Sequence, residues 1–217
     1  MRYRPYDAIL QRCYTAVLMD VMDAMGAREQ SLDPGIRPLD PGMRMWGEAV
    51  TMLLEAVDEP PEHPFQLEME VLDDLRPGQV VVAQCDAPRL SAFWGGLLSN
   101  AAVGRGGAGV VTDGGARDYA EIVSLGFPVF CRGLTPYDSQ GRMDGTARDV
   151  PITCGGVAVA PGDLIFGDAD GVVVVPSAMA DEVIRRAGGK VRGEDTVREE
   201  LRRGAGMVET FKKYGIL

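Results

Sequence analysis

The sequence contains a single histidine, His63, which lies in the proline-rich stretch EPPEHPF. A lone histidine in such a loop is most simply a surface residue. Acid–base chemistry that depends on histidine and metal sites built from several histidines are therefore nearly excluded. The cysteines are scattered and form no Cys-x-x-Cys pair, which argues against a disulfide framework and against a cysteine metal site; they are Cys13, Cys85, Cys131 and Cys154. Any catalysis must use carboxylates, arginine, backbone amides, water or a metal bound by oxygen.

Long apolar runs and positive charge are also scarce. No apolar run approaches the length of a membrane span. The N-terminal stretch MRYRPYDAILQRCY has no uninterrupted apolar segment of the kind that a signal peptide carries. We therefore expect a cytoplasmic protein that binds no membrane. The 32 acidic and 22 basic residues give a formal net charge of −10, which argues against a nucleic-acid partner. An anionic small molecule is still compatible with this charge, because one arginine or a metal ion can outweigh the overall field.

The remaining composition is that of an ordinary globular protein. The chain has 217 residues, of which 46% are hydrophobic and 25% charged, enough for one good core. No fixed-period repeat and no linker-like change of composition divides it. The sequence therefore predicts a single domain over residues 1–217.

Residues 94–132 hold the most informative pattern. Apolar residues at helical spacing over 97–103 predict a helix, and the apolar run 108–112 predicts a buried strand. Gly114 and Gly115 then allow a tight turn, which is followed by Arg117 and Asp118. A cation and a carboxylate thus stand side by side at a strand-to-helix turn, where ligands of open α/β sheets usually bind.

The rest of the chain also mixes helices and strands. Apolar spacing predicts a long helix over residues 6–25, and glycine-punctuated apolar runs in the later half predict hairpins. The further predicted helices cover residues 65–75, 119–125, 178–187, 194–203 and 207–217. The predicted strands cover residues 47–57, 80–84, 128–131, 147–154, 157–159, 164–167 and 172–175. This alternation indicates the α/β class.

Two motifs resemble one known family. The sequences DGGARD at 113–118 and PGDLIFGDADGVVVVP at 161–176, in this order, are similar to those of the RraA-like family. That family includes divalent-metal pyruvate aldolases that cleave 4-hydroxy-4-methyl-2-oxoglutarate and decarboxylate oxaloacetate, and also non-enzymatic regulators of a ribonuclease. The resemblance implies a β/β/α sandwich of the swivelling-domain type with helical N- and C-terminal extensions.

The resemblance also implies roles for individual residues. Arg117 and Asp118 match the family's catalytic pair, in which the arginine holds the keto acid and the aspartate binds Mg²⁺ or Mn²⁺. Glu194 matches an acid that reaches a metal-bound water from the neighbouring subunit. This role implies a homotrimer or a dimer of trimers with the site at an interface.

The loop before the first helix of this segment completes the implied site. The amides of Leu97 and Leu98, which follow Gly95 and Gly96, match those that bind the pyruvate carboxylate. An anion is favoured there because amides at a helix N-terminus point toward it. One position departs from the aldolases, which carry an acid where this chain has Gly96, with twenty residues between it and Arg117. Asp86 and Asp113 are the alternatives that the sequence offers.

The sequence therefore predicts a divalent-metal-dependent lyase that releases pyruvate from a 2-keto acid, by retro-aldol cleavage, by oxaloacetate decarboxylation or by both. Two alternatives stay open: a non-catalytic, ring-forming binding or regulatory protein, and a lyase for a different hydroxy or keto acid. Without the family pattern, Arg117–Asp118 would be a salt bridge or cap at a helix start. Glu194 would lie on a solvated helix face, and Asp168 and Asp170 would be turn residues.

Overall fold

The computed structural model describes residues 2–87 and 90–216. Its helices are η1 (Arg4–Tyr6), α1 (Asp7–Leu10), α2 (Thr15–Ala24), α3 (Gln66–Asp74), α4 (Gly96–Gly104), α5 (Tyr119–Leu125), α6 (Ala180–Arg202) and α7 (Met207–Tyr214). Its strands are β1 (Arg37–Pro38), β2 (Met45–Ala56), β3 (Gln79–Asp86), β4 (Ala92–Trp94), β5 (Gly109–Thr112), β6 (Gly115–Ala116), β7 (Val129–Cys131), β8 (Gly133–Leu134), β9 (Met143–Arg148), β10 (Ile152–Cys154), β11 (Val157–Val159), β12 (Leu164–Asp168) and β13 (Gly171–Val175).

The main sheet has the strand order β1-β7-β5-β3-β2-β12-β13, with β9 also paired to β2. Strands β2, β3, β5 and β7 run parallel, whereas β12 and β9 run antiparallel to the first and second halves of β2. Strand β5 and residues 80–83 of β3 are valine-rich and buried, as expected for parallel strands that are covered on both faces.

The sheet curls until its two ends nearly meet. Ser31 forms a bridge with Val173, and backbone bonds from Leu32 N to Val172 O and from Val174 N to Gln30 O extend it. The segment that leads into β1 at one end thus pairs with β13 at the other end. The result is a nearly closed, barrel-like sheet, and the α/β prediction is confirmed.

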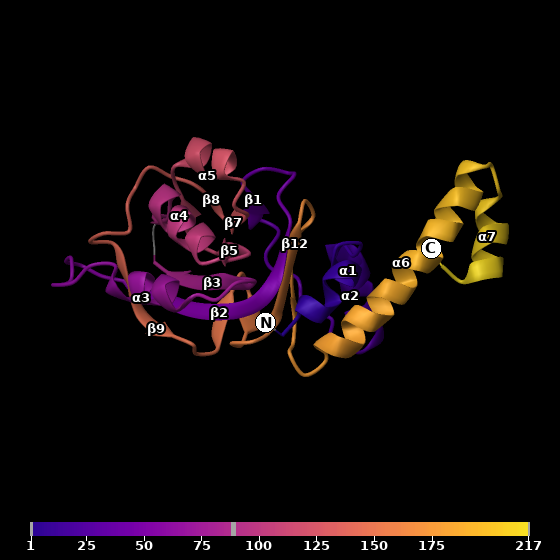
Figure 1. Cartoon of the computed structure of the whole chain (residues 1–217), viewed down its shortest axis with the longest axis horizontal. Helices are drawn as coiled ribbons and strands as arrows, with labels where there is room; N and C mark the ends of the chain where they lie inside the picture. Colours follow the sequence, from indigo (N-terminus) through magenta and orange to yellow (C-terminus); the bar gives the residue numbers. More distant parts are fainter. Residues whose placement is uncertain (1, 88–89, 217) are drawn as a thin grey trace.

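Two apolar clusters stabilise the fold on opposite sides of the sheet. One lies under α3, α4 and α5, and the other lies between β12–β13 and helices α1, α2 and α6. Figure 1 shows this arrangement, with α6 and α7 extending away from the body. No helix in the described ranges is both long enough and apolar enough to cross a membrane.

The predicted N-terminal helix over residues 6–25 is wrong in one respect, because it is broken at residues 11–14. Tyr14 is extended (φ −143°, ψ 162°), and α2 starts anew at Thr15. The reason is a distant carboxylate: Asp168 accepts hydrogen bonds from the Thr15 backbone N (2.9 Å) and from Thr15 Oγ1 (2.8 Å). Asp168 therefore determines where α2 begins. It is also the turn residue that the sequence predicts.

Three other predicted boundaries change. The predicted helices over 178–187 and 194–203 form one helix, α6, whose Gly188 lies against α1; a Cβ there would be 2.7 Å from Ile9 Cγ2. The predicted strand over 147–154 divides into β9 and β10, because Asp149 has a left-handed φ of 54° and Pro151 follows. The last predicted helix ends as α7 at Tyr214, and Leu217 lies outside the described residues.

Candidate active site

A small parallel sheet holds the predicted site residues. Its strands are β4, β6 and β8 in the order β4-β6-β8. Gly95 and Gly96 follow β4, and Arg117 and Asp118 follow β6. The Arg117 backbone N donates to Trp94 O at 3.0 Å, which joins the two strand ends. The two predicted segments therefore meet at the carboxyl ends of parallel strands, where such sheets bind ligands.

Asp118 is held in an uncommon conformation. It is left-handed (φ 60°, ψ 39°) at the start of α5, and its side chain does not cap that helix. Its Oδ2 instead accepts a hydrogen bond of 2.9 Å from the Gly96 backbone N. A left-handed non-glycine residue costs on the order of 1–3 kcal/mol and tends to occur at functional sites. The simpler interpretation of Asp118 as a cap of α5 does not describe this geometry.

Arg117 lies between two carboxylates. Its Nη1 is 3.2 Å from Asp138 Oδ2, and its Nε is 3.9 Å from Asp118 Oδ2. The side chains of Arg117 and Asp118 are 40% and 45% exposed, so both groups can meet a ligand. Asp138 is a site residue that the sequence analysis missed, because it lies in the loop after β8 with no motif around it.

The two glycines after β4 let carboxylates approach the backbone. A Cβ at Gly95 would lie 2.7 Å from Asp118 Oδ2. A Cβ at Gly96 would lie 2.9 Å from Glu121 Oε1 and would overlap the rest of that carboxylate. The Asn100 Nδ2 also donates to Glu121 Oε1 at 2.8 Å. Glu121 therefore occupies the space from which an acid at position 96 would start.

The amides at the start of α4 face the same region. The first intrahelical bond runs from Ser99 N to Gly95 O at 3.0 Å, and the Gly96 amide is taken by Asp118. The amides of Leu97 and Leu98 precede that first bond, so they have no intrahelical acceptor. They can bind an anion in the way predicted.

The comparison with known proteins agrees with this arrangement. Residues 15–174 match the sequence pattern of the family described as RraA-like, Aldolase/RraA. The chain belongs to the RraA-like family.

Individual relatives extend this result. A protein of Halalkalibacterium halodurans, named provisionally as a 4-hydroxy-4-methyl-2-oxoglutarate aldolase, is 34% identical over 85% of this chain and 82% of its own length. RraAS2 of Streptomyces coelicolor, described as an unusual member of the RNase ES inhibitor RraA protein family, is 32% identical. Its structure aligns with a TM-score of 0.80 over 91% of this chain and 98% of that chain. A Pseudomonas syringae pv. tomato protein has a TM-score of 0.84 at 29% identity, covering 96% and 94% of the two chains.

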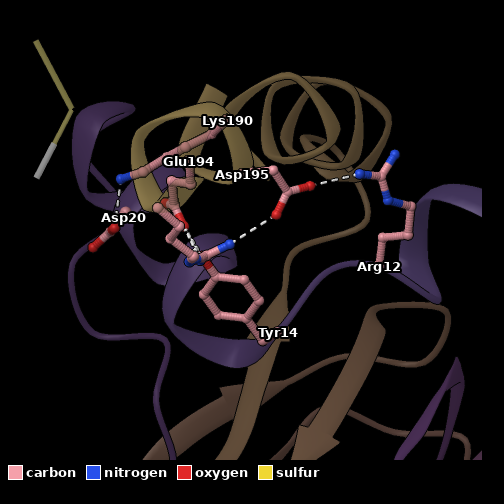
Figure 2. Close-up of polar contacts among 7 residues, drawn as sticks. Arg12, Tyr14, Asp20, Lys190, Glu194 and Asp195 are labelled. Atoms are coloured by element: carbon pink, nitrogen blue, oxygen red, sulfur yellow. Dashed lines mark hydrogen bonds and ion pairs between the residues drawn. The ribbon is translucent and has the colours of Figure 1, made fainter. Parts of the chain in front are cut away.

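Glu194 does not join the RraA-like site within one chain. It lies on α6, on the other side of the main sheet from α4 and α5 (Figure 1). Its side chain is 13% exposed, accepts a hydrogen bond from the Tyr14 hydroxyl and pairs with Arg198 at 2.5 Å. Figure 2 shows it between two further contacts of α6 with the N-terminal helices, Lys190–Asp20 and Asp195–Arg12. Its action on a neighbouring subunit stays a prediction.

Asp113, an alternative acid suggested by the sequence, has a structural role, because its side chain binds backbone amides. Its Oδ1 accepts from Cys85 N (2.7 Å) and its Oδ2 from Gly155 N (3.1 Å), which ties β3 and β5 to the β10–β11 hairpin. Burial raises the pKa of this carboxyl group, although the two amides partly offset that effect. Asp86 is exposed at the end of β3.

The side chains around Asp118 offer oxygen donors to a divalent metal. Within residues 2–87 and 90–216, no group of three or more histidine, cysteine, aspartate or glutamate side chains converges as a metal site. The carboxylates of Asp118 and Glu121 nevertheless lie against two consecutive residues, Gly95 and Gly96. Mg²⁺ is commonly held by one or two carboxylates, with waters and substrate completing its shell. The oxygen donors present therefore fit a hard divalent cation.

Proposed function

We propose that this chain is a divalent-metal-dependent lyase that releases pyruvate from a 2-keto acid. The observation that carries the proposal is the meeting of three features at one strand edge: the Arg117–Asp118 turn, the α4 amides, and Glu121 in the space beside Gly96. The relative named as an aldolase supports the lyase class. The absence of a second histidine agrees with chemistry that uses carboxylates, arginine and water.

The chain's own residues account for substrate binding. The amides of Leu97 and Leu98 would hold the substrate carboxylate at the positive end of α4. The guanidinium of Arg117 would donate to the 2-keto oxygen, and Asp138 keeps that guanidinium in place with its 3.2 Å contact. The substrate is thereby oriented with its keto group between the arginine and the carboxylates.

Asp118 and Glu121 would hold Mg²⁺ or Mn²⁺. When bound, such an ion supplies Lewis-acid polarisation of the keto acid. In retro-aldol cleavage the 4-hydroxyl group loses its proton, the C3–C4 bond breaks, and C3 takes up a proton. In oxaloacetate decarboxylation the bond to the leaving carboxylate breaks, CO₂ departs and C3 takes up a proton. Both reactions place negative charge on the keto oxygen, which Arg117 stabilises.

Pyruvate release from oxaloacetate and from 4-hydroxy-4-methyl-2-oxoglutarate tests the proposal. It should be measured with Mg²⁺, with Mn²⁺ and with EDTA, after subtraction of the metal-only background for oxaloacetate. We expect metal-dependent turnover that Arg117→Ala and Asp118→Ala each reduce by about 100-fold or more. Arg117→Ala removes a donor to the developing oxyanion, whose loss has an effect of this size, and Asp118→Ala removes a proposed metal ligand. Glu121→Gln should raise the metal concentration needed for half-maximal activity.

Asp23→Ala is the matched control for Asp118→Ala, because Asp23 is an exposed aspartate on α2, away from the site. It should leave turnover unchanged. Turnover equal to background for both substrates would contradict the pyruvate-lyase proposal. Turnover of another hydroxy or keto acid, with the same dependence on Asp118, would instead identify a lyase of different specificity.

A second candidate is a non-catalytic regulatory protein, and the likeness to RraAS2, with its stated RNase ES inhibitor family, favours it. A regulator should bind its partner equally well with Mg²⁺ and with EDTA. Ribonuclease inhibition that survives Asp118→Ala, in a protein without metal-dependent turnover, would support this candidate.

We also propose that the protein acts as a homotrimer or a dimer of trimers in the cytoplasm. Large apolar side chains are exposed around the site: Leu97 is 84%, Leu134 51% and Tyr119 44% exposed. Exposed apolar groups of this kind commonly mark a surface that another protein covers. A neighbouring subunit that covers this surface would exclude water from Arg117 and Asp118.

A further inference from the structure

A ligand-sized groove lies at the opposite end of the parallel strands from the candidate active site. Its volume is about 640 Å³, within the range of small-molecule sites. It is bounded by the N-terminal segment 2–7, the start of β2, the turn before β3, and the loop before β5. Those elements meet at the amino ends of β2, β3 and β5, whereas Arg117 and Asp118 follow a strand's carboxyl end.

Four arginines line this groove: Arg2, Arg4, Arg44 and Arg76. The only acidic residues in its lining are Asp7 and Glu48, so the charged side chains leave an excess of two positive charges. The whole chain has a net charge of −10. A concentration of arginine therefore stands out against the general charge of the protein.

None of these four arginines forms an ion pair within the described residues. Arg2 donates to the Ser177 carbonyl (2.6 Å), and Arg44 to the carbonyls of Gln11 (3.1 Å) and Cys13 (2.6 Å). Carbonyl acceptors leave the positive charge of a guanidinium uncompensated. Arg4 and Arg76 make no side-chain hydrogen bond or ion pair within residues 2–87 and 90–216.

Trp46 and its neighbours fix the position of Arg44. The Arg44 guanidinium lies 5.8 Å from the centre of the Trp46 ring and 5.6 Å from that of Phe166. The Trp46 indole N–H donates to Asp7 Oδ1 at 2.9 Å, so this groove acid already has a partner. The groove therefore presents pre-positioned positive charge beside the apolar surface of Met45, Trp46 and Ala108.

We propose that this groove binds a small phosphorylated molecule, with a phosphate dianion held by Arg4 and Arg76 and its organic part against Trp46. The planar forks of two guanidiniums match phosphate oxygens, and two negative charges balance the excess in the groove. The volume exceeds what a free phosphate ion needs. This inference goes beyond the lyase proposal and does not depend on it.

Calorimetric titration of the full-length protein, in metal-free buffer of low ionic strength, tests this site. The probes are inorganic phosphate, inorganic pyrophosphate and phenyl phosphate. The part of the tryptophan fluorescence that Trp46→Phe removes, leaving that of the buried Trp94, reports on the groove itself. We expect saturable binding, with phenyl phosphate tighter than inorganic phosphate because it also covers apolar surface. Arg4→Ala/Arg76→Ala should weaken binding by about tenfold or more, since bonds between charged groups are lost.

Arg28→Ala/Arg202→Ala is the matched control, because it removes the same charge from exposed positions outside the groove. It should leave the affinity unchanged. The proposal is overturned if no probe binds saturably, or if both double variants lose affinity equally, which would indicate a diffuse charge effect. It is also overturned if Arg4→Ala/Arg76→Ala changes the sedimentation coefficient instead of the affinity, because the groove would then be a subunit interface. The single variant Arg76→Ala, at an exposed turn, gives a second measure of the site.

Discussion

At the scale of single residues, the most unusual group outside the site is Glu68 on α3. It is 1% exposed, and neither carboxylate oxygen has a hydrogen-bond partner within the described residues. Burial, with a smaller contribution from Asp144, raises the pKa of Glu68 to about 7. The folded protein therefore keeps this group protonated under conditions where the unfolded chain ionises it.

The stability of the protein should depend on pH through Glu68. Between about pH 4.5 and pH 7 the unfolded chain loses this proton and the folded chain keeps it. The free energy of unfolding should therefore fall as pH rises through this window, by on the order of 3 kcal/mol, and then level off. Glu68→Gln should remove that part of the slope in urea unfolding at pH 5, 6, 7 and 8. If the free energy of unfolding of Glu68→Gln depends on pH in the same way as that of the parent and of the exposed control Glu70→Gln, this assignment is contradicted.

Gly96 and Glu121 should behave as a pair. Gly96→Asp would introduce the acid of the aldolases, but its Cβ would overlap the Glu121 carboxylate. We expect a loss of about 1–3 kcal/mol in the free energy of unfolding, as for other overpacked positions. The double variant Gly96→Asp/Glu121→Ala should recover the stability that Gly96→Asp loses, and it should show metal-dependent turnover. Urea unfolding and pyruvate release measure both effects, and a Gly96→Asp protein as stable as the parent would disprove the overlap.

The sequence indicates some of these site residues and conceals others. Arg117 and Asp118 lie in a recognisable motif after a strand, so their meeting with the α4 loop could be predicted. Glu121 has the appearance of an ordinary acid in the first turn of a helix, where acids are common. Only the position of its carboxylate beside Gly96 separates it from that class.

At the scale of elements, local patterns predict where helices and strands form better than where they begin and end. The α2 start depends on Asp168, which lies 153 residues further along the chain. That determinant is not local, so apolar spacing alone predicted a helix through the break at residues 11–14. Apolar spacing also predicted a gap at residues 188–193, which α6 spans without a break.

Removal of the Asp168 carboxylate should loosen α2. Asp168 accepts hydrogen bonds from the Thr15 backbone N, from Thr15 Oγ1 and from the Asp170 backbone N, and it is 8% exposed. Asp168→Ala should lower the free energy of unfolding by about 2–3 kcal/mol, since a helix cap is lost and buried donors are left unpaired. Hydrogen exchange should show the loss first in the α2 amides. Asp170→Ala, at an exposed position in the same turn, should cost less than about 0.5 kcal/mol; equal costs would contradict the capping role.

At the scale of the whole molecule, the position of Glu194 away from its own chain's site predicts that it acts across a subunit interface or has a structural role alone. Co-expression of Asp118→Ala with Glu194→Ala subunits distinguishes these cases, because each alone should be inactive. If Glu194 completes a neighbour's site, random assembly should restore about a quarter of the parent turnover, since one subunit pairing in four has both groups intact. If verified mixed oligomers recover no turnover, the role of Glu194 is limited to its structural contacts with Tyr14 and Arg198.

The long sequence separation between α2 and its cap also affects folding during synthesis. The apolar face of α2, which includes Val17, Leu18 and Val21, packs against β12, β13 and α6, all of which are made late. With ribosomes adding about 5–20 residues per second, the 153 residues between Thr15 and Asp168 take roughly 8–30 seconds to synthesise. Throughout that time α2 has neither its cap nor its packing surface. The apolar face of α2 therefore stays uncovered until β12, β13 and α6 have been made.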